Sequence, residues 1–125
     1  MTSALLCSSR SVTVPTLAAD LLAAGIAVRA TVDDCSKLVQ AVVQHAPDVV
    51  VCDVALPGAA WFQALQLLGQ TVPCPLVVFT QDTDVGHMQQ AIDCGVHVYV
   101  VNGYGASRLR PLIHLAQARF HKERQ

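Results

Sequence analysis

Asp53 is the side chain of this 125-residue sequence with the clearest capacity for chemistry. It directly follows Val49–Cys52, an unbroken run of β-branched and small apolar residues that is typical of a strand buried on both faces. The dipeptide Pro57-Gly58 then predicts a turn. Because ligands of open α/β sheets bind at the carboxyl ends of the strands, a carboxylate here is a candidate functional group. The alternative is that Asp53 only caps the turn that follows it.

Four further apolar runs predict strands, and helical patterns separate them. The strands are expected at Ala4–Cys7, Ile26–Val32, Val49–Cys52, Leu76–Phe79 and Val96–Val101. The helices are expected from about Thr13 to Gly25, from Asp34 or Ser36 to Pro47, over Trp61–Leu68, over Val85–Cys94 and from about Arg108 onward. Such alternation requires a parallel sheet with helices on both faces. The sequence therefore predicts one α/β domain, a flavodoxin-like (βα)5 three-layer sandwich with strand order 2-1-3-4-5.

This strand order brings four loops to one rim of the sheet, namely those after Cys7, Cys52, Phe79 and Val101. Two details of the helices can also be predicted. Helical spacing in the fourth helix indicates an inward face made of Val85, Met88, Ala91 and Ile92. Pro111, near the start of the last helix, predicts an irregular first turn.

The (βα)5 pattern, the turn from Asp53 to Gly58, Thr80 at the end of the fourth strand and Tyr99 in the fifth resemble the receiver domain of bacterial two-component response regulators. The resemblance covers essentially the whole chain. It implies that Asp53 accepts a phosphoryl group from a histidine kinase, that Thr80 turns toward the phosphoryl oxygens, and that the rotamer of Tyr99 follows this movement. The residues alone leave two alternatives open: Thr80 as an ordinary strand end and Tyr99 as a core aromatic.

Four segments resemble a narrower group, the nitrate-responsive transcription antiterminators of the ANTAR type. These segments are Pro47–Gly58, Val77–Thr80, Met88–Val96 and Ala116–Phe120. The resemblance implies control by a partner sensor protein that sequesters the regulator until nitrate or nitrite arrives, with transcription antitermination as the output. Residues 1–125 are then expected to be a single receiver domain at the N-terminal part of a longer regulator, and RNA would be bound only by a C-terminal ANTAR domain absent from this chain.

The sequence departs from the receiver pattern at the positions that support phosphorylation. Receivers carry an acidic pair after the first strand and a lysine after the fifth, whereas this chain has Ser8, Ser9 and Asn102. Asp33 and Asp34 imitate the pair, but they follow the second strand and lie only 20 and 19 positions before Asp53, against 45 and 44 for the serines. We therefore do not assign them to the acidic pair.

Losing two carboxylates takes the formal charge of the site from −3 to −1. A unit charge pair about 4 Å apart is worth roughly 4 kcal/mol at an effective dielectric constant of about 20, before desolvation. Mg²⁺ usually takes at least one or two carboxylate ligands. We therefore expect weak or absent Mg²⁺ binding, no cofactor, and phosphorylation of Asp53 that is disfavoured.

Composition and motifs narrow the remaining function classes. No apolar run approaches the roughly 20 residues that cross a bilayer, so a cytoplasmic protein without a membrane partner is expected. The five cysteines form no C-x-x-C pair and the five histidines no H-x-x-x-H pair, so neither a disulfide framework nor a metal site is indicated. No P-loop, dinucleotide fingerprint or nucleophile elbow occurs, and we expect no enzyme.

Basic side chains are concentrated in the last helix, and this distribution indicates which partners the chain could contact. Residues 1–106 carry three basic and eight acidic side chains, whereas residues 107–125 carry five basic and one acidic. A basic final helix suits a nucleic-acid contact, although a solvated helix face is the more common explanation. Asp84 and Asp93 flank the fourth helix and Arg108 and Arg110 open the fifth, so a homodimer through the fourth helix, fifth strand and fifth helix is one hypothesis.

Two other functions remain open at this stage. One is a conventional Mg²⁺-dependent phospho-receiver switched by a histidine kinase. The other is a flavodoxin-like binder of a small molecule or anion at the Ser8–Ser11 loop. Asp82 and Asp84, which follow Thr80 closely, are expected at a solvated loop edge without a compensating role.

Overall fold

The computed structural model describes residues 2–8 and 16–124, which form one parallel sheet with flanking helices. The strands are β1 (Thr2–Ser8), β2 (Ile26–Val32), β3 (Val49–Asp53), β4 (Leu76–Thr80) and β5 (Val98–Val101). The helices are α1 (Leu17–Ala23), α2 (Leu38–His45), α3 (Ala59–Thr71), α4 (Val85–Asp93) and α5 (Leu109–Glu123), with 3₁₀ turns η1 (Cys35–Lys37) and η2 (Ala106–Arg108) before α2 and α5. None of the helices in these described residues is long and apolar enough to cross a membrane.

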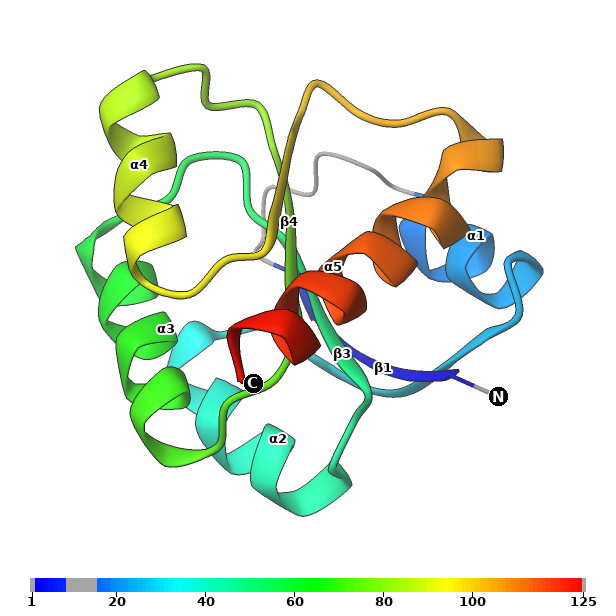
Figure 1. Ribbon diagram of the computed structural model, residues 1–125, viewed down its shortest axis with the longest axis horizontal. Coiled ribbons are helices and arrows are strands. Elements are labelled where there is room, and N and C mark those ends of the chain that lie inside the picture. The colour runs from blue at the N-terminus through cyan, green and yellow to red at the C-terminus, as the bar shows by residue number, and fades with distance from the viewer. Residues whose placement is uncertain (1, 9–15, 125) are drawn as a thin grey trace.

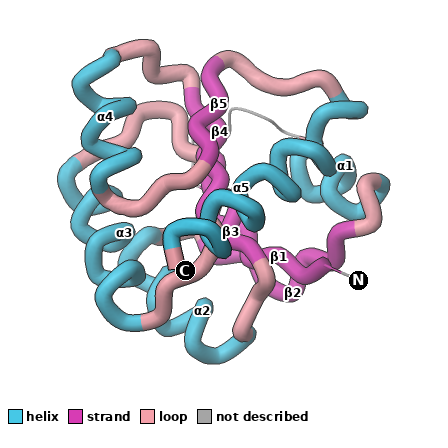
Figure 2. Tube along the Cα trace, in the orientation of Figure 1, coloured by secondary structure: helices cyan, strands magenta, loops and turns pink. Residues whose placement is uncertain are grey.

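The strand order is β2-β1-β3-β4-β5, and every neighbouring pair is parallel (Figure 2). Helices α1 and α5 cover one face of the sheet, and α2, α3 and α4 cover the other (Figure 1). Two apolar clusters fill the space beneath these layers, and successive residues of β1 such as Leu5 and Leu6 contribute to opposite clusters. β3 and β4 are buried along their whole length. The predicted flavodoxin-like (βα)5 sandwich is confirmed.

Local signals at the helix starts act largely as the sequence predicts. Asp34 accepts a hydrogen bond from the backbone N–H of Ser36 at 2.9 Å and begins turn η1 ahead of α2. Turn η2 precedes α5 and Pro111 is the third residue of that helix, so the predicted irregular start is confirmed. The start of the first helix, expected near Thr13, lies outside the described residues.

Helix α4 is less buried than its sequence pattern predicts. Ala91 is fully buried and Met88 is partly buried, but Val85 is 74% exposed and Ile92 is 43% exposed. The helix packs beside β5, the four-residue strand at the edge of the sheet, so only a narrow stripe of it reaches the core. The predicted inward positions of Val85 and Ile92 are therefore wrong, and both side chains remain on the surface.

Candidate functional site at the carboxyl ends of the strands

Asp53 is buried at the carboxyl end of β3, with only 1% of its surface exposed. In the sheet register, Ser8 of β1 is its partner on one side and Phe79 of β4 is its partner on the other. Thr80 is the next residue of β4. The parallel order thus brings Ser8, Asp53 and Thr80 to one rim of the sheet, whereas Ser9 lies outside the described residues.

The hydroxyl of Thr80 joins two loops of this rim. Its Oγ1 donates a hydrogen bond to the carbonyl of Ala55, in the loop after Asp53, at 3.0 Å. The same oxygen accepts a hydrogen bond from the backbone N–H of Asp82 at 3.1 Å. Because the hydroxyl has one proton to donate, a movement of Thr80 toward Asp53 would break the bond to Ala55. Thr80 is therefore positioned to couple the two loops.

Asp82 is buried in the loop before α4, so the expectation that this residue lies at a solvated loop edge is wrong. It is 9% exposed, and its Oδ1 accepts a hydrogen bond from the backbone N–H of Asp84 at 2.9 Å. Its Oδ2 lies 2.6 Å from Nδ1 of His87. Asp84 is exposed and caps α4 by accepting from the backbone N–H of His87 at 3.0 Å. These bonds fix the start of α4 to the loop that follows Thr80.

The same contacts shift two protonation equilibria. Hydrogen bonds from the backbone of Asp84 and then from His87 lower the pKa of Asp82 below its ordinary 3.8. The hydrogen bond to Asp82 raises the pKa of His87 above its ordinary 6.5. An ionised Asp82 and a protonated His87 therefore stabilise each other at the start of α4.

This pair predicts a pH window for stability. The contribution of Asp82 is present above pH 3.8 and is lost as the pH falls through its lowered pKa. The contribution of His87 is complete below pH 6.5 and is lost as the pH rises through its raised pKa. We expect the difference in unfolding free energy between the wild type and H87Q, measured with urea, to be larger at about pH 5.5 than at about pH 8.5. Equal differences at both pH values would contradict the pairing.

Tyr99 lies on β5 and packs against the apolar cluster beneath α2, α3 and α4. Its hydroxyl is buried and has no hydrogen-bond partner among residues 2–8 and 16–124. Burial raises the pKa of Tyr99, and the charge of Asp82 raises it further, whereas the nearby Thr80 hydroxyl offsets part of the rise without reaching hydrogen-bonding geometry. A buried hydroxyl without a partner costs stability, so a rearrangement of this rim that supplied one would be favoured.

Asn102 directly follows β5 and is the residue predicted to replace the receiver lysine. Its side chain is exposed, and its backbone has a φ of 61°, in the left-handed region that asparagine tolerates better than most residues. Its backbone N–H donates to the carbonyl of Thr80 at 3.0 Å, which extends the pairing of β4 with β5 by one residue. This position therefore contributes a neutral amide and no positive charge.

Tyr104 and Asp20 belong to the rim, and the sequence reasoning missed both. The hydroxyl of Tyr104 donates to Oδ2 of Asp20 at 2.5 Å, and its ring packs on Phe79 with centroids 5.1 Å apart. Burial raises the pKa of Tyr104 most, the bond to Asp20 adds to the rise, and the charge of Asp53 contributes as well. The only local signal was an aromatic residue two positions after Asn102. Tyr104 ties the loop after β5 to α1.

The residues around Asp53 fit a magnesium ion poorly. Mg²⁺ prefers hard oxygen ligands, and its protein sites usually include carboxylates. Asp33 is instead at the surface, 3.5 Å from Lys37, and Asp34 caps turn η1. In the part of the chain that the structure describes, no three side chains of His, Cys, Asp or Glu are grouped so that they could hold a metal ion. The side chain beside Asp53 on β1 is the neutral hydroxyl of Ser8.

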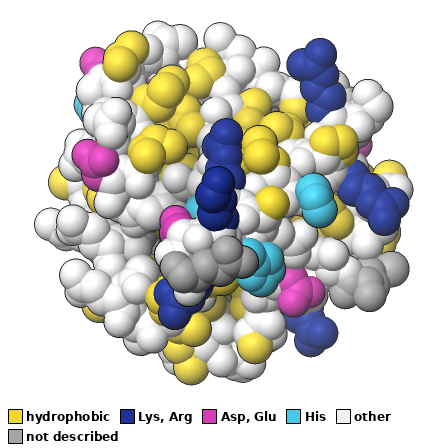
Figure 3. Space-filling view, viewed as in Figure 1, with side chains coloured by type: hydrophobic (Ala, Val, Ile, Leu, Met, Phe, Trp, Pro, Cys, Tyr) yellow, Lys and Arg dark blue, Asp and Glu magenta, His cyan; other side chains and the backbone are white. Residues whose placement is uncertain are grey.

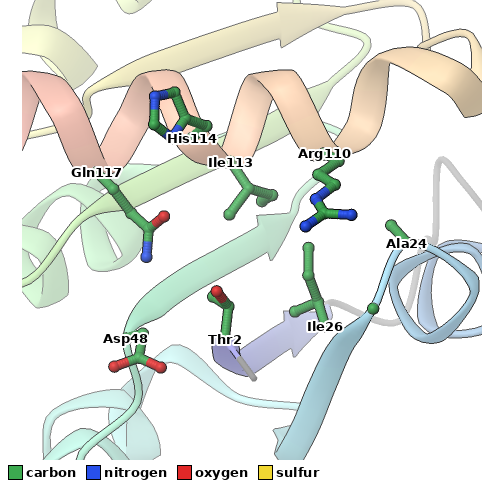
Figure 4. Close-up of a pocket in the computed structure, with 9 residues that line it drawn as sticks. Thr2, Ala24, Ile26, Asp48, Arg110, Ile113, His114 and Gln117 are labelled. Atoms are coloured by element: carbon green, nitrogen blue, oxygen red, sulfur yellow. The ribbon is translucent and has the colours of Figure 1, made fainter.

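A cavity of about 470 Å³ lies at the amino ends of the strands, opposite the rim that carries Asp53 (Figure 4). Thr2 at the start of β1 and Asp48 just before β3 form part of its wall. Gln117 of α5 points toward them across the cavity, and Arg110 of α5 points toward Ile26 at the start of β2. Because Asp53 ends the strand that Asp48 precedes, this cavity lies away from the rim and takes no part in the site.

A five-stranded parallel sheet with a buried carboxylate ending its central strand and a threonine ending the next defines a receiver-type domain. The chain belongs to the response regulator receiver domain family, whose model matches residues 11–114. A structural neighbour is the signal receiver domain of a modulated diguanylate cyclase from Desulfovibrio desulfuricans G20, with a TM-score of 0.83 at 22% identity over 98% of both chains. At that identity the likeness shows the shared fold.

Two relatives in sequence are parts of longer proteins. A protein-glutamate methylesterase/protein-glutamine glutaminase of Nitrosospira multiformis is 37% identical over 73 residues, which are 56% of this chain and 21% of that protein. The transcriptional regulatory protein PdtaR of Mycobacterium tuberculosis is 32% identical over 78 residues, which are 62% of this chain and 38% of that protein. The match thus covers less than half of either relative.

Proposed function

We propose that this chain is an atypical receiver that signals by protein–protein contact, with Asp53 as a retained but poorly supported phosphoacceptor. One observation supports the proposal: Ser8 of β1 is the register partner of Asp53 on β3, and by the resemblance an acidic residue is expected at this position. Asn102 likewise stands where a lysine is usual. In this proposal the domain is cytoplasmic, catalyses no reaction itself and binds Mg²⁺ weakly or not at all.

Electrostatics supports a weak phosphoacceptor. Phosphoryl transfer depends mainly on positioning and on groups that stabilise the charge of the transferred phosphoryl group. Mg²⁺ and a lysine supply that charge in typical receivers, whereas Ser8 and Asn102 are neutral. A phosphoryl group on the 1%-exposed Asp53 would add negative charge without these partners. Phosphorylation is therefore disfavoured, although Asp53 still ends β3 and Thr80 still ends β4 at the rim.

The proposed contact surface is the face formed by α4, β5 and α5. Three large hydrophobic side chains are exposed on its two helices: Val85 and Ile92 on α4 and Leu115, 39% exposed, on α5. Figure 3 shows hydrophobic side chains gathered over α4 and β5, beside Lys and Arg side chains near α5. Apolar side chains with charges around them are typical of sites that bind another protein.

A second copy of the chain suits the charges of this face. Asp84 and Asp93 lie at the two ends of α4, and Arg108 lies just before α5; all three are exposed. Arg110, the other basic residue of the predicted pairing, lines the cavity of about 470 Å³ instead. In a two-fold dimer each acidic–basic contact occurs twice. Such contacts at the edge of an interface affect orientation and association rate more than affinity. The homodimer is therefore part of the proposal, beside contacts with a sensor protein or a histidine kinase.

For the output, we propose transcription antitermination in nitrate or nitrite assimilation. The support is the resemblance of four segments to ANTAR-type regulators and the sequence similarity to PdtaR, a transcriptional regulatory protein. RNA would then be bound by a further domain, and the receiver would control that domain through protein contacts.

A titration with Mg²⁺ and beryllofluoride, a mimic of the phosphoryl group, tests the proposal. We expect no chemical-shift change at Thr80 or Tyr99 by NMR at millimolar Mg²⁺. Sedimentation of the same samples at high protein concentration and low salt is expected to show a dimer with or without beryllofluoride. Shifts at both residues would favour a conventional phospho-receiver, a monomer would contradict the dimer, and a response of Ser8 to phosphate alone would favour an anion binder.

A further inference from the structure

Cys7 and Cys52 are directly opposite each other on neighbouring strands. They are register partners in the pairing of β1 with β3, and both side chains belong to the apolar cluster beneath α2 and α3. Neighbouring strands lie about 4.8 Å apart, which is within the Cα separation of roughly 4.4–6.8 Å that a disulfide spans. Their positions are therefore compatible with a bridge between β1 and β3.

A cavity of about 210 Å³ gives a small reagent access to Cys7, whereas Cys52 is fully buried behind it. Cys7 lines it together with Cys35 of turn η1 and Trp61 of α3. The indole N–H of Trp61 is buried and has no hydrogen-bond partner within residues 2–8 and 16–124, although it lies close enough to Cys52 to lower the pKa of that thiol in part. An oxygen atom added to a sulfur here would meet an available donor.

The two thiols differ in reactivity. The hydrogen bond with the thiol of Cys52 lowers the pKa of Cys7 despite its burial. The same hydrogen bond and complete burial raise the pKa of Cys52. The thiolate is the nucleophilic form of cysteine. Cys7 is therefore the thiol that reacts first with an oxidant, and Cys52 is the thiol that then reacts with the oxidised Cys7. Cys74, whose pKa burial raises to about 12, provides an inert comparison.

We propose that Cys7 and Cys52 form a reversible, peroxide-sensitive thiol pair that modifies the rim of the sheet. The thiolate sulfur of Cys7 attacks one oxygen of a peroxide ROOH; the O–O bond breaks, and Cys7 becomes a sulfenic acid while RO⁻ takes up a proton and leaves as ROH. The sulfur of Cys52 then attacks the sulfur of Cys7, the S–O bond breaks, and water leaves with the proton of Cys52. Two thiols and one peroxide thus give a disulfide, an alcohol or water, and a water molecule.

The bridge would act on the functional site through the strands. Cys7 immediately precedes Ser8, and Cys52 immediately precedes Asp53. The bridge would fix the separation of β1 and β3 at this point and thereby restrict the movement of Ser8 and Asp53 at the rim. Strained or exposed disulfides are the readily reduced, regulatory ones, and the cavity beside Cys7 would expose this bridge to a small reductant. This input needs no phosphoryl transfer, and the proposal does not depend on the output proposed above.

Peroxide treatment followed by peptide mapping tests the pair. The reduced protein is exposed to hydrogen peroxide, its remaining thiols are alkylated, and it is digested before aspartate residues. This digestion places each of the five cysteines in a different peptide, because Asp20, Asp34, Asp48, Asp53 and Asp93 separate them. We expect the intact mass to fall by two hydrogens, a crosslink between the peptides that carry Cys7 and Cys52, and full reversal by dithiothreitol.

Matched variants sharpen the test. C7A and C52A are expected to lose the crosslink, whereas C74A, which also removes a buried thiol, keeps it. A crosslink from Cys7 to Cys35, oxidation to sulfinic acid without a crosslink, or five unmodified thiols would each overturn the proposal. If C7A or C52A fails to fold, the peptide map of the wild type decides the outcome.

Discussion

Replacing Ser8 and Ser9 by aspartate and Asn102 by lysine is expected to convert the chain into a domain that binds Mg²⁺ and accepts beryllofluoride at Asp53. The triple variant S8D/S9D/N102K restores both negative charges and the positive charge that receivers carry. Each charge contact at about 4 Å is worth roughly 4 kcal/mol at an effective dielectric constant of about 20, and desolvation removes part of it. We therefore expect Mg²⁺ affinity to rise by about two orders of magnitude, or about 2.7 kcal/mol.

Calorimetric Mg²⁺ titration of the wild type and the triple variant measures this difference. Two control variants locate the effect. Adding D53N should abolish the gain, because it removes the third carboxylate of the site. Adding D33N should leave the gain intact, because Asp33 lies at the surface beside Lys37. Mg²⁺ binding of the wild type that is as tight as that of the triple variant would contradict the electrostatic explanation and the proposed function with it.

The hydrogen bonds of the rim connect the loop after Asp53 to α4. Ala55 follows Asp53 closely and accepts the Thr80 hydroxyl proton, and Thr80 accepts from the backbone of Asp82. Asp82 in turn holds His87 in the first turn of α4. A change in the loop after Asp53 thus has a continuous path to α4, which carries part of the proposed contact face. The path is a chain of hydrogen-bonded neighbours, and the H87Q variant tests its last contact, the one between Asp82 and His87.

The central strand and the rim could be predicted because their signals are local. The run Val49–Cys52 has the composition of a strand buried on both sides, and the structure buries all of β3. Once the five strands alternate with helices, the right-handed crossover rule leaves few strand orders. The pairing of Ser8 with Asp53 in the sheet then follows from the fold. That Ser8 and Ser9 replace an acidic pair stays a prediction.

The contacts that hold the rim together could not be predicted, because they join distant segments. Tyr104 and Asp20 are 84 positions apart, and nothing near either residue indicates the other. The helical pattern of α4 indicated a buried face, but α4 lies at the edge of the sheet, where the neighbouring strand is short. Exposure of Val85 depends on that tertiary position, which overrides the periodicity of the sequence.

His97 is another buried residue without a sequence signal, and replacing it is expected to cause a large loss of stability. It is 7% exposed, and its Nδ1 accepts a hydrogen bond from the backbone N–H of Leu76 at 3.0 Å. Its Nε2 therefore carries the proton, which it donates to Oε1 of Glu123 at 3.1 Å. The carbonyl of His97 also accepts from Arg119 at 2.6 Å. The residue thus joins the starts of β4 and β5 to the end of α5.

H97A should lower the free energy of unfolding by about 2–4 kcal/mol, because it leaves the N–H of Leu76 buried without its acceptor and opens a cavity beside Phe120. H97N keeps an acceptor near the position of Nδ1 and should recover about half of the loss. E123Q removes only a charge at an exposed side chain and should change stability by less than about 1 kcal/mol. Urea unfolding at neutral pH measures all three. Equal losses for H97A and H97N would mean that the lost volume, and not the hydrogen bond to Leu76, accounts for the effect.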